Sequence, residues 1–134
     1  MKFKKFKFKK VKSTNNTAIR IIKGSNHNTG MVVSEIQTMG RGQYGRKWIS
    51  LKGNLFVSFF NELNKKNLSI NIITKINCLL VKKLLSSFTR KKILFKKPND
   101  LLINKKKISG ILQEVIFTRN KKFLITGIGI NIIK

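Results

Sequence analysis

A glycine-rich segment without periodicity separates two apolar runs in the first half of the chain. Residues 37–53 contain four of the nine glycines and show neither the alternation of a strand nor the 3.6-residue period of a helix. The runs on either side, 31–35 and 55–60, have the length and composition of buried strands. The segment is therefore predicted to be a long loop that joins two strands, which requires a fold containing a sheet.

Capping residues and the spacing of apolar side chains predict two helices. Ser13 or Thr14 can cap a helix over 15–23. A longer helix is predicted over 69–88, with Ser69 as its cap, because apolar side chains recur every three or four residues. The recurring residues are Ile70, Ile73, Ile76, Leu80, Leu84 and Phe88.

The remaining apolar runs are predicted to be strands. One pair forms a hairpin that turns near Asn104–Lys105, and the last run is very apolar and interrupted by Gly127 and Gly129. Strands and helices are mixed along a chain of single-domain length, so 1–134 is predicted to be one α+β (mixed α/β) domain. The predicted strands are 6–11, 31–35, 55–60, 93–95, 101–103, 108–117 and 123–133.

The charge of the chain is strongly unbalanced. Thirty Lys and Arg residues face four Asp and Glu residues, which gives a formal net charge of +26. Such a field attracts polyanions, whereas AT-rich codon usage with a solvated surface is the alternative explanation. Three of the four acids lie within the motifs described below, so each is expected to have a local partner.

Cysteine usage and hydropathy bear on the compartment. The single cysteine, Cys78, cannot form an internal disulfide and is expected to pack as a small apolar residue in the long helix. No window offers 18 apolar residues, and the first 12 residues carry charge without an apolar core, so neither a membrane span nor a signal peptide is predicted. A cytoplasmic protein is expected.

The glycine-rich loop has the composition of an anion-binding site. Glycines at 40, 42 and 45 let the backbone approach a ligand closely and form a nest of N–H groups. Arg41, Arg46 and Lys47 add positive charge, and Trp48 adds a flat apolar face. These features suit a nucleotide, although basic loops of this kind also bind RNA or serve as solvated turns.

The wider segment, from Ser34 to Ser58, resembles the biotin-binding loop of biotin protein ligases, E-x-Q-x-x-G-R-G-R-x-G-R-x-W-x-S followed by G-N-L-x-x-S. Four further blocks resemble motifs of the same family in the same order, over residues 13–131. One block could arise by chance, whereas five in register are highly specific. The further blocks are Ser13-Thr14-Asn15, Lys96-Lys97-Pro98-Asn99-Asp100-Leu101, Lys107-Ile108-Ser109-Gly110-Ile111-Leu112-Gln113-Glu114 and Gly127-Ile128-Gly129-Ile130-Asn131.

The resemblance implies a mixed, mostly antiparallel sheet with flanking helices, similar to class II aminoacyl-tRNA synthetases. It implies an enzyme that joins biotin to ATP as biotinyl-5′-AMP, with Mg²⁺, and then transfers biotin to a lysine of a biotin carboxyl carrier protein. No covalent enzyme intermediate is involved in the family, which agrees with a sequence that offers no evident Ser-His-Asp set. Neither specific DNA binding nor membrane binding is expected.

By position in the motifs, the resemblance assigns roles to individual residues. Lys96 and Arg41 are the expected catalytic residues, and no residue is assigned as a direct metal ligand. The residues expected to bind biotin are Ser13, Thr14, Asn15, Gln37, Gly40, Arg41, Gly42, Gln43, Lys96 and Gly110; those expected to bind ATP are Arg46, Lys47, Trp48, Asn99 and Asn131.

The sequence departs from the family pattern in two ways. Gln43 stands where many relatives carry an arginine that helps to retain the adenylate, so leakage of biotinyl-adenylate is expected, and Lys97 replaces an aromatic residue. Family domains also continue past the last block, so the resemblance implies a catalytic domain without the rest of its C-terminal part, a winged helix or a β-barrel. The strand over 123–133 is then expected to lie exposed.

Several alternatives remain open at the level of sequence. An incomplete domain could be inactive, form a homodimer or require a complementing chain. A lipoate ligase of the same fold is less favoured, because its R-R-x-S-G-G-G-A-type run is absent. A basic nucleic-acid-binding protein would explain the charge but not the motifs from Lys96 to Asp100 and from Gly127 to Asn131.

Overall fold

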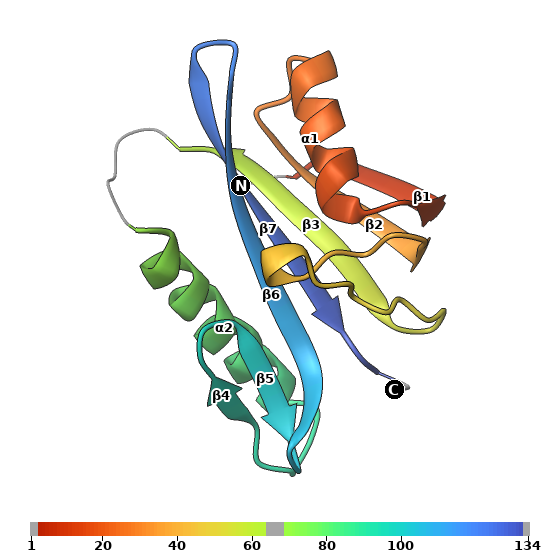
Figure 1. Ribbon diagram of the computed structural model, residues 1–134, viewed down its shortest axis with the longest axis vertical. Coiled ribbons are helices and arrows are strands. Elements are labelled where there is room, and N and C mark those ends of the chain that lie inside the picture. The colour runs from red at the N-terminus through yellow and green to blue at the C-terminus, as the bar shows by residue number, and fades with distance from the viewer. Residues whose placement is uncertain (1–2, 64–68, 133–134) are drawn as a thin grey trace.

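The computed structural model describes residues 3–63 and 69–132, which contain one seven-stranded sheet and two α-helices (Figure 1). The strands are β1 (Lys5–Val11), β2 (Thr29–Gln37), β3 (Leu55–Glu62), β4 (Leu94–Lys96), β5 (Asp100–Ile103), β6 (Lys106–Thr118) and β7 (Lys121–Ile130). The helices are α1 (Thr14–Gly24) and α2 (Ile70–Ser86), with a short 3₁₀ helix, η1, at Gln43–Gly45.

The sheet has the order β1-β2-β3-β7-β6-β5-β4, and all its pairs except β1 with β2 are antiparallel. The predicted α+β class and the mostly antiparallel sheet are confirmed. Each predicted strand is present, and residue 133, the last of the predicted final strand, lies outside the described residues. Among the described residues, no helix combines the length and apolar character that crossing a membrane requires.

Helix α1 forms as the sequence predicts and covers one face of the sheet. The Ser13 hydroxyl oxygen accepts a hydrogen bond from the Asn16 backbone N–H at 3.2 Å and so caps the first turn. Ala18 and Ile22 are fully buried against Val32, Phe60, Phe123 and Ile125 of the sheet. This first apolar cluster fixes α1 over β2, β3 and β7.

Helix α2 forms over the predicted range, but the face that it buries differs from the predicted stripe. The side chains turned toward the sheet include Thr74, Cys78 and Val81, which are at most 9% exposed. The recurring stripe instead includes Leu84 and Phe88, which are 60% and 79% exposed. A helix that is apolar almost all round has no single periodic face, so the spacing does not determine its orientation.

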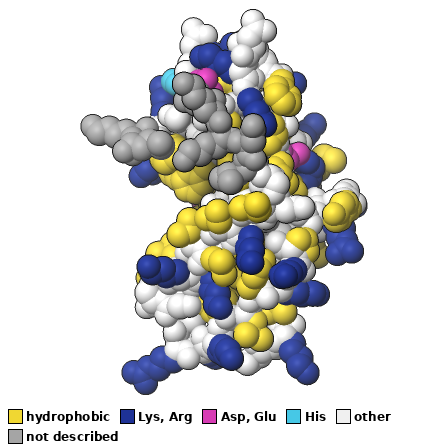
Figure 2. All heavy atoms as spheres, turned by 90° about the vertical axis from the view of Figure 1, so that its left-hand side faces the viewer, with side chains coloured by type: hydrophobic (Ala, Val, Ile, Leu, Met, Phe, Trp, Pro, Cys, Tyr) yellow, Lys and Arg dark blue, Asp and Glu magenta, His cyan; other side chains and the backbone are white. Residues whose placement is uncertain are grey.

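Figure 2 views the molecule from the side of α2 and shows apolar side chains on this surface between Lys and Arg side chains. A second apolar cluster lies beneath the helix, where Cys78 contacts Ile93, Leu101 and Ile111. Cys78 therefore packs as predicted.

Strand β7 lies in the interior of the sheet between β3 and β6, so the expectation of an exposed strand is wrong for its first half. Phe123 and Ile125 are fully buried, because they face α1, and both edges of the strand are hydrogen-bonded to neighbours. The strand also runs through Gly127 and Gly129 without a break. The glycines serve a different purpose, described below.

Two tight turns set the register of the C-terminal half. Asn104 and Lys105 have positive φ angles of 50° and 64°, which is the backbone of a two-residue hairpin turn, as predicted for this position. Arg119 and Asn120 form a second such turn, with φ of 54° and 57°, between β6 and β7. The two turns place β5, β6 and β7 side by side, with Gly110 opposite both Asp100 and Gly129.

Successive side chains of a strand point to opposite faces, so β6 and β7 each serve two environments. Ile125 packs with α1, whereas Ile128, three residues later, packs with α2. On the α1 face, the continuation of β7 beyond Ile125 carries only glycines, and the space above them is where the predicted motifs meet.

Candidate ligand-binding cavity

A cavity of about 380 Å³ lies above β6 and β7 on the α1 face. Its walls come from the start of α1, the loop around η1, the connection from β4 to β5 and the start of β6. This volume is within the usual range for small-molecule sites, roughly 300–1,000 Å³. Of the residues predicted to bind biotin or ATP, all but two line it: Ser13, Thr14, Asn15, Gln37, Arg41, Gly42, Gln43, Arg46, Lys47, Trp48, Lys96, Asn99 and Gly110.

The cavity floor exists because β6 and β7 carry glycines where other residues would project side chains. A Cβ added to Gly129 would meet the Trp48 indole nitrogen at 2.6 Å, and one added to Gly110 would meet the same ring at 2.9 Å. A Cβ at Gly127 would collide with the Asn15 amide. The glycines therefore let Trp48 and Asn15 lie directly on the sheet.

Trp48 closes the cavity together with a lysine that was not predicted as a site residue. The Lys107 ammonium lies 4.8 Å from the centre of the Trp48 ring and 3.0 Å from a carboxylate oxygen of Asp100. Lys107 and Asp100 both line the cavity. Their sequence signal was available, since Lys107 opens the block that ends at Glu114 and Asp100 follows Asn99.

A polar network connects the start of α1 to the floor. The Ser58 hydroxyl lies between Thr14 Oγ1, at 2.7 Å, and Asn15 Oδ1, to which it donates. The Asn15 amide nitrogen donates to the Leu112 carbonyl at 3.3 Å and to Glu114 at 3.0 Å. Ser13, Thr14, Asn15 and Ser58 are at most 4% exposed, so this wall is both polar and buried.

Arg41 is the loop residue that reaches this network. Its two terminal nitrogens donate to the two carboxylate oxygens of Glu114, at 3.1 and 2.6 Å. Its Nε is buried and has no hydrogen-bond partner in the described part of the chain. The indole nitrogen of Trp48 is buried in the same condition. A buried donor without a hydrogen bond is energetically costly. These two donors, on residues that line one cavity, are therefore expected to bind acceptor atoms of a ligand.

Gln37 and Gly40 fix the position of the loop through contacts within the protein. The Gln37 carbonyl oxygen accepts from the Thr14 backbone at 2.7 Å, and its amide nitrogen donates to the Ser50 hydroxyl at 3.0 Å. Gly40 does not line the cavity, and a Cβ there would meet the Trp48 carbonyl at 2.5 Å. A close approach of backbone to backbone explains the glycine.

Asn131, predicted to contact ATP, also lies outside the cavity lining. Its side chain donates to the Lys107 carbonyl at 3.2 Å, and its backbone N–H donates to the Ile108 carbonyl at 2.7 Å. Asn99 does line the cavity, but its amide donates to the Ile111 carbonyl at 2.9 Å. Both asparagines therefore hold backbone next to the site in this structure.

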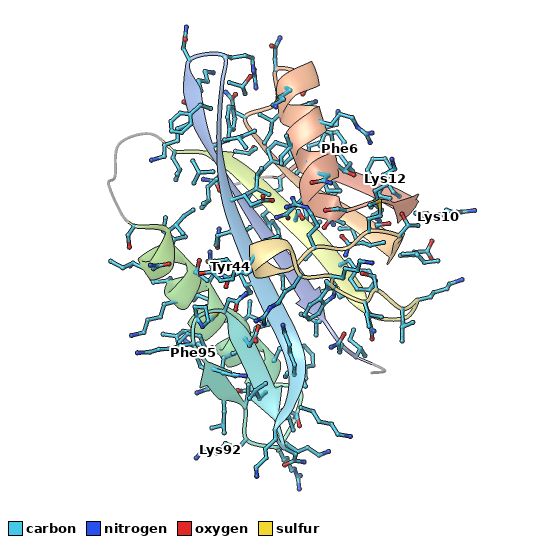
Figure 3. All side chains as sticks on the ribbon, in the orientation of Figure 1. Phe6, Lys10, Lys12, Tyr44, Lys92 and Phe95 are labelled. Atoms are coloured by element: carbon cyan, nitrogen blue, oxygen red, sulfur yellow. The ribbon has the colours of Figure 1, made fainter. Side chains whose placement is uncertain are left out.

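The outer wall of the cavity is basic. Arg46, Lys47, Lys96 and Lys97 line it with exposed side chains. Two carboxylates lie close by and each is paired with a cation: Asp100, which lines the cavity, with Lys107, and Glu114, behind the lining, with Arg41. Tyr44 lies at the mouth, 92% exposed and with a positive φ of 55°, and Figure 3 shows it extending from the loop. The described residues contain no group of three potential metal ligands among His, Cys, Asp and Glu.

Comparison with known proteins gives a consistent match. Residues 7–131 match the profile of the biotin/lipoate A/B protein ligase family. The chain is 33% identical over 101 residues to the bifunctional ligase/repressor BirA of Escherichia coli, a match that covers 74% of this chain and 32% of that protein.

Solved structures of biotin protein ligases share the fold. The Aquifex aeolicus enzyme in complex with biotin and ATP has a TM-score of 0.77 and 36% identity, covering 95% of this chain and 51% of that one. The Leishmania major enzyme in complex with biotinyl-5-AMP has a TM-score of 0.79 and 28% identity, covering 100% and 59%. The chain thus spans about a third of BirA and between half and three-fifths of these two structures. With motifs, fold and profile in agreement over nearly its whole length, the chain belongs to the biotin/lipoate A/B protein ligase family.

Proposed function

We propose that the cavity binds biotin and ATP, joins them as biotinyl-5′-AMP, and then presents the acyl group to a lysine of a biotin carboxyl carrier protein. The observation that supports this most is the cavity itself. A glycine floor, a buried polar wall, and two unpaired donors carried by a basic loop occur together in a chain of the biotin/lipoate ligase family. The relatives solved with biotin, ATP or biotinyl-5-AMP support the choice of ligands.

The polar wall formed by buried Ser13, Thr14 and Asn15, together with half-buried Gln37, suits the ureido ring of biotin. That ring offers one carbonyl acceptor and two N–H donors, and the wall presents hydroxyl and amide groups held in place by the sheet. Preorganised polar groups of this kind provide specificity at low entropic cost. The apolar valeryl chain would then run over the glycine floor toward the basic mouth.

The first chemical step joins two anions. An oxygen of the biotin carboxylate attacks the α-phosphorus, the bond from this phosphorus to the bridging oxygen breaks, and pyrophosphate leaves. Lys96 and Lys107 both line the cavity and carry ammonium groups that offset the charge as the anions approach. The unpaired Nε–H of Arg41 and indole N–H of Trp48 are further donors for the carboxylate or phosphoryl oxygens.

The nucleotide end is supported by the outer part of the loop. Trp48 offers the flat face of an indole, and Arg46 and Lys47 offer exposed cations for the phosphates. Asn99 and Asn131 shape this end through the backbone of β6. Mg²⁺ would enter on the triphosphate, since Mg²⁺ keeps several waters and binds through substrate phosphates, and Asp100 and Glu114 are already paired.

In the second step, the amine of the acceptor lysine attacks the acyl carbon, the bond from carbon to the phosphate oxygen breaks, and AMP leaves with loss of a proton from nitrogen. No enzyme nucleophile is needed. An acceptor rich in acidic residues would be attracted by the net charge of +26. The proposal also includes a cytoplasmic setting, and either a homodimer or a complementing chain.

Pyrophosphate release from the purified full chain, with ATP, Mg²⁺ and either biotin or lipoate, tests the proposal. Release that requires biotin supports it, and release that requires lipoate instead assigns the other activity of the family. If neither acid stimulates release while labelled nucleic acid binds in a salt-dependent manner, the basic surface rather than the cavity carries the function.

A further inference from the structure

Glu114 does not line the cavity itself but contacts two residues that do, Arg41 and Asn15, and no predicted role explains it. It lies on β6, on the α1 face, and it is one of only four acidic residues in the chain. Its carboxylate receives both terminal nitrogens of Arg41, at 3.1 and 2.6 Å, and the side-chain nitrogen of Asn15, at 3.0 Å. The Glu114 carboxylate on β6 thus holds both Arg41 of the glycine-rich loop and Asn15 of α1.

The contacts with Glu114 fix the orientation of the Arg41 guanidinium and use both of its terminal nitrogens. A guanidinium that forms a two-point pair with a carboxylate is fixed in a plane and has its charge largely offset. Its remaining inward group, Nε–H, is the one that is buried without a partner. Arg41 therefore offers the cavity a directed donor, while the unpaired positive charge at the mouth comes from lysines such as Lys96.

The contacts also restrict Asn15. Its nitrogen is directed to Glu114 and the Leu112 carbonyl, and its oxygen receives the Ser58 hydroxyl, so the amide has one orientation. The Arg41 and Glu114 side chains are 35% and 26% exposed, so the pair is partly screened and its main effect is on geometry rather than on global stability.

We propose that Glu114 is the positioning residue of the site, which sets the glycine-rich loop and the Asn15 amide in a ligand-ready arrangement before any ligand binds. That the ligand is biotin rests on the proposed function. The arrangement of Glu114, Arg41 and Asn15 does not depend on it. Glu114 acts through Arg41 and Asn15 and takes no part in bond making.

The first test needs no ligand. Trp48 is the only tryptophan of the chain and lies on the same loop, so its fluorescence reports the loop directly. Glu114→Gln keeps the shape but removes the charge that both Arg41 nitrogens require. We expect a shifted emission and faster quenching by acrylamide than in the native chain, with a melting temperature that stays close to native.

The matched control is Glu62→Gln. Glu62 lies 3.7 Å from the Lys121 ammonium, and neither of the two lines the cavity, whereas the partners of Glu114 do. Glu62→Gln therefore removes a paired carboxylate that holds no cavity residue. We expect native emission and quenching. Equal changes in the Glu62 and Glu114 variants would overturn the proposal, because any lost charge pair would then have the same effect.

The second test is a double-mutant cycle on biotin affinity with Arg41→Gln and Glu114→Gln. Each single change is expected to weaken binding about tenfold, the usual scale for a charge-assisted hydrogen bond. The double variant is expected to be little weaker than either single one, since both break the same unit. Fully multiplicative losses would contradict action through Arg41.

The two tests separate the proposals. A native chain without biotin affinity, whose Trp48 emission still shifts with Glu114→Gln, would refute the proposed function and leave the positioning role intact. A native chain that binds biotin, with unchanged emission and affinity in the Glu114 variant, would refute the positioning role alone.

Discussion

The two faces of β6 and β7 differ in their side chains: the face toward α2 is filled by apolar residues, and the face toward α1 carries glycines. Beneath α2, Ile111 of β6 and Ile128 of β7 belong to the apolar cluster that contains Cys78. Facing α1, the same strands present Gly110, Gly127 and Gly129, with Glu114 beyond them. Alternation along each strand allows one face to be packed for stability while the other is emptied for a ligand.

The difference suggests that stability and ligand binding can be changed separately. A truncation under α2 should cost folding free energy without reaching the cavity, and an added side chain on the glycine floor should do the reverse. Any substitution that changes both by similar amounts would show that the faces are coupled through the strands.

The largest effect is expected from Leu101→Ala. Leu101 is fully buried in the cluster under α2, so its truncation leaves a cavity and should lower the free energy of unfolding by about 2–5 kcal/mol. Urea denaturation followed by circular dichroism measures the loss. Biotin affinity should stay within about twofold of native; a parallel loss of affinity would break the separation.

Gly129→Val should have the opposite effect, a loss of ligand affinity with little change in stability. A Cβ at this position would lie 2.6 Å from the Trp48 indole, so the ring must move off the floor. Displacement of this size is expected to weaken biotin and ATP binding about a hundredfold, while the midpoint of unfolding changes little. Ile130→Val, on the other face of the same strand and outside the cavity lining, is the control and should bind biotin and ATP normally.

Gln43→Arg sharpens the account of the loop. Gln43 lines the cavity at the position where the motif that the loop resembles has arginine. A cation there would add a charge-assisted contact to the phosphate of the proposed adenylate. Labelling of a non-acceptor protein should fall about tenfold relative to the native chain. Equal labelling by both proteins would show that residue 43 does not control retention.

The smallest effect concerns pH and the α2 face alone. Burial, with a smaller contribution from Asp100, raises the pKa of the Cys78 thiol from 9.0 to about 11. The unfolded chain therefore ionises first, and the stabilising effect, complete below pH 9, is lost progressively as pH rises through the folded pKa of about 11. At pH 10 the native chain should have lost about 1 kcal/mol more than Cys78→Ala, measured by urea denaturation.

The sequence predicted local features well. The Ser13 cap, the range of α2 and the turn at Asn104–Lys105 depend on neighbouring residues, and the structure contains all three. The motifs identified most of the cavity lining because each is a short segment whose residues stay together in the fold. Their individual roles in binding and catalysis remain predictions.

What depends on distant residues could not be read from the chain. No periodicity indicates that β7 enters the sheet between β3 and β6, so its burial was missed. The orientation of α2 was missed because an apolar helix can turn several faces inward. Arg41 and Glu114 are 73 positions apart, so no local pattern predicts that they form a pair. The contact of Lys107 with Trp48 is equally invisible in the local sequence.

We propose that the glycine-lined face of β6 and β7 forms and holds biotinyl-5′-AMP. Native mass spectrometry of the full chain, after incubation with biotin, ATP and Mg²⁺, tests this directly. We expect the native protein and Ile130→Val to carry bound biotinyl-5′-AMP, at no more than one per chain, and Gly129→Val to carry none. Equal occupancy of the native and Gly129→Val chains, or a native chain that gains no adenylate, would contradict it.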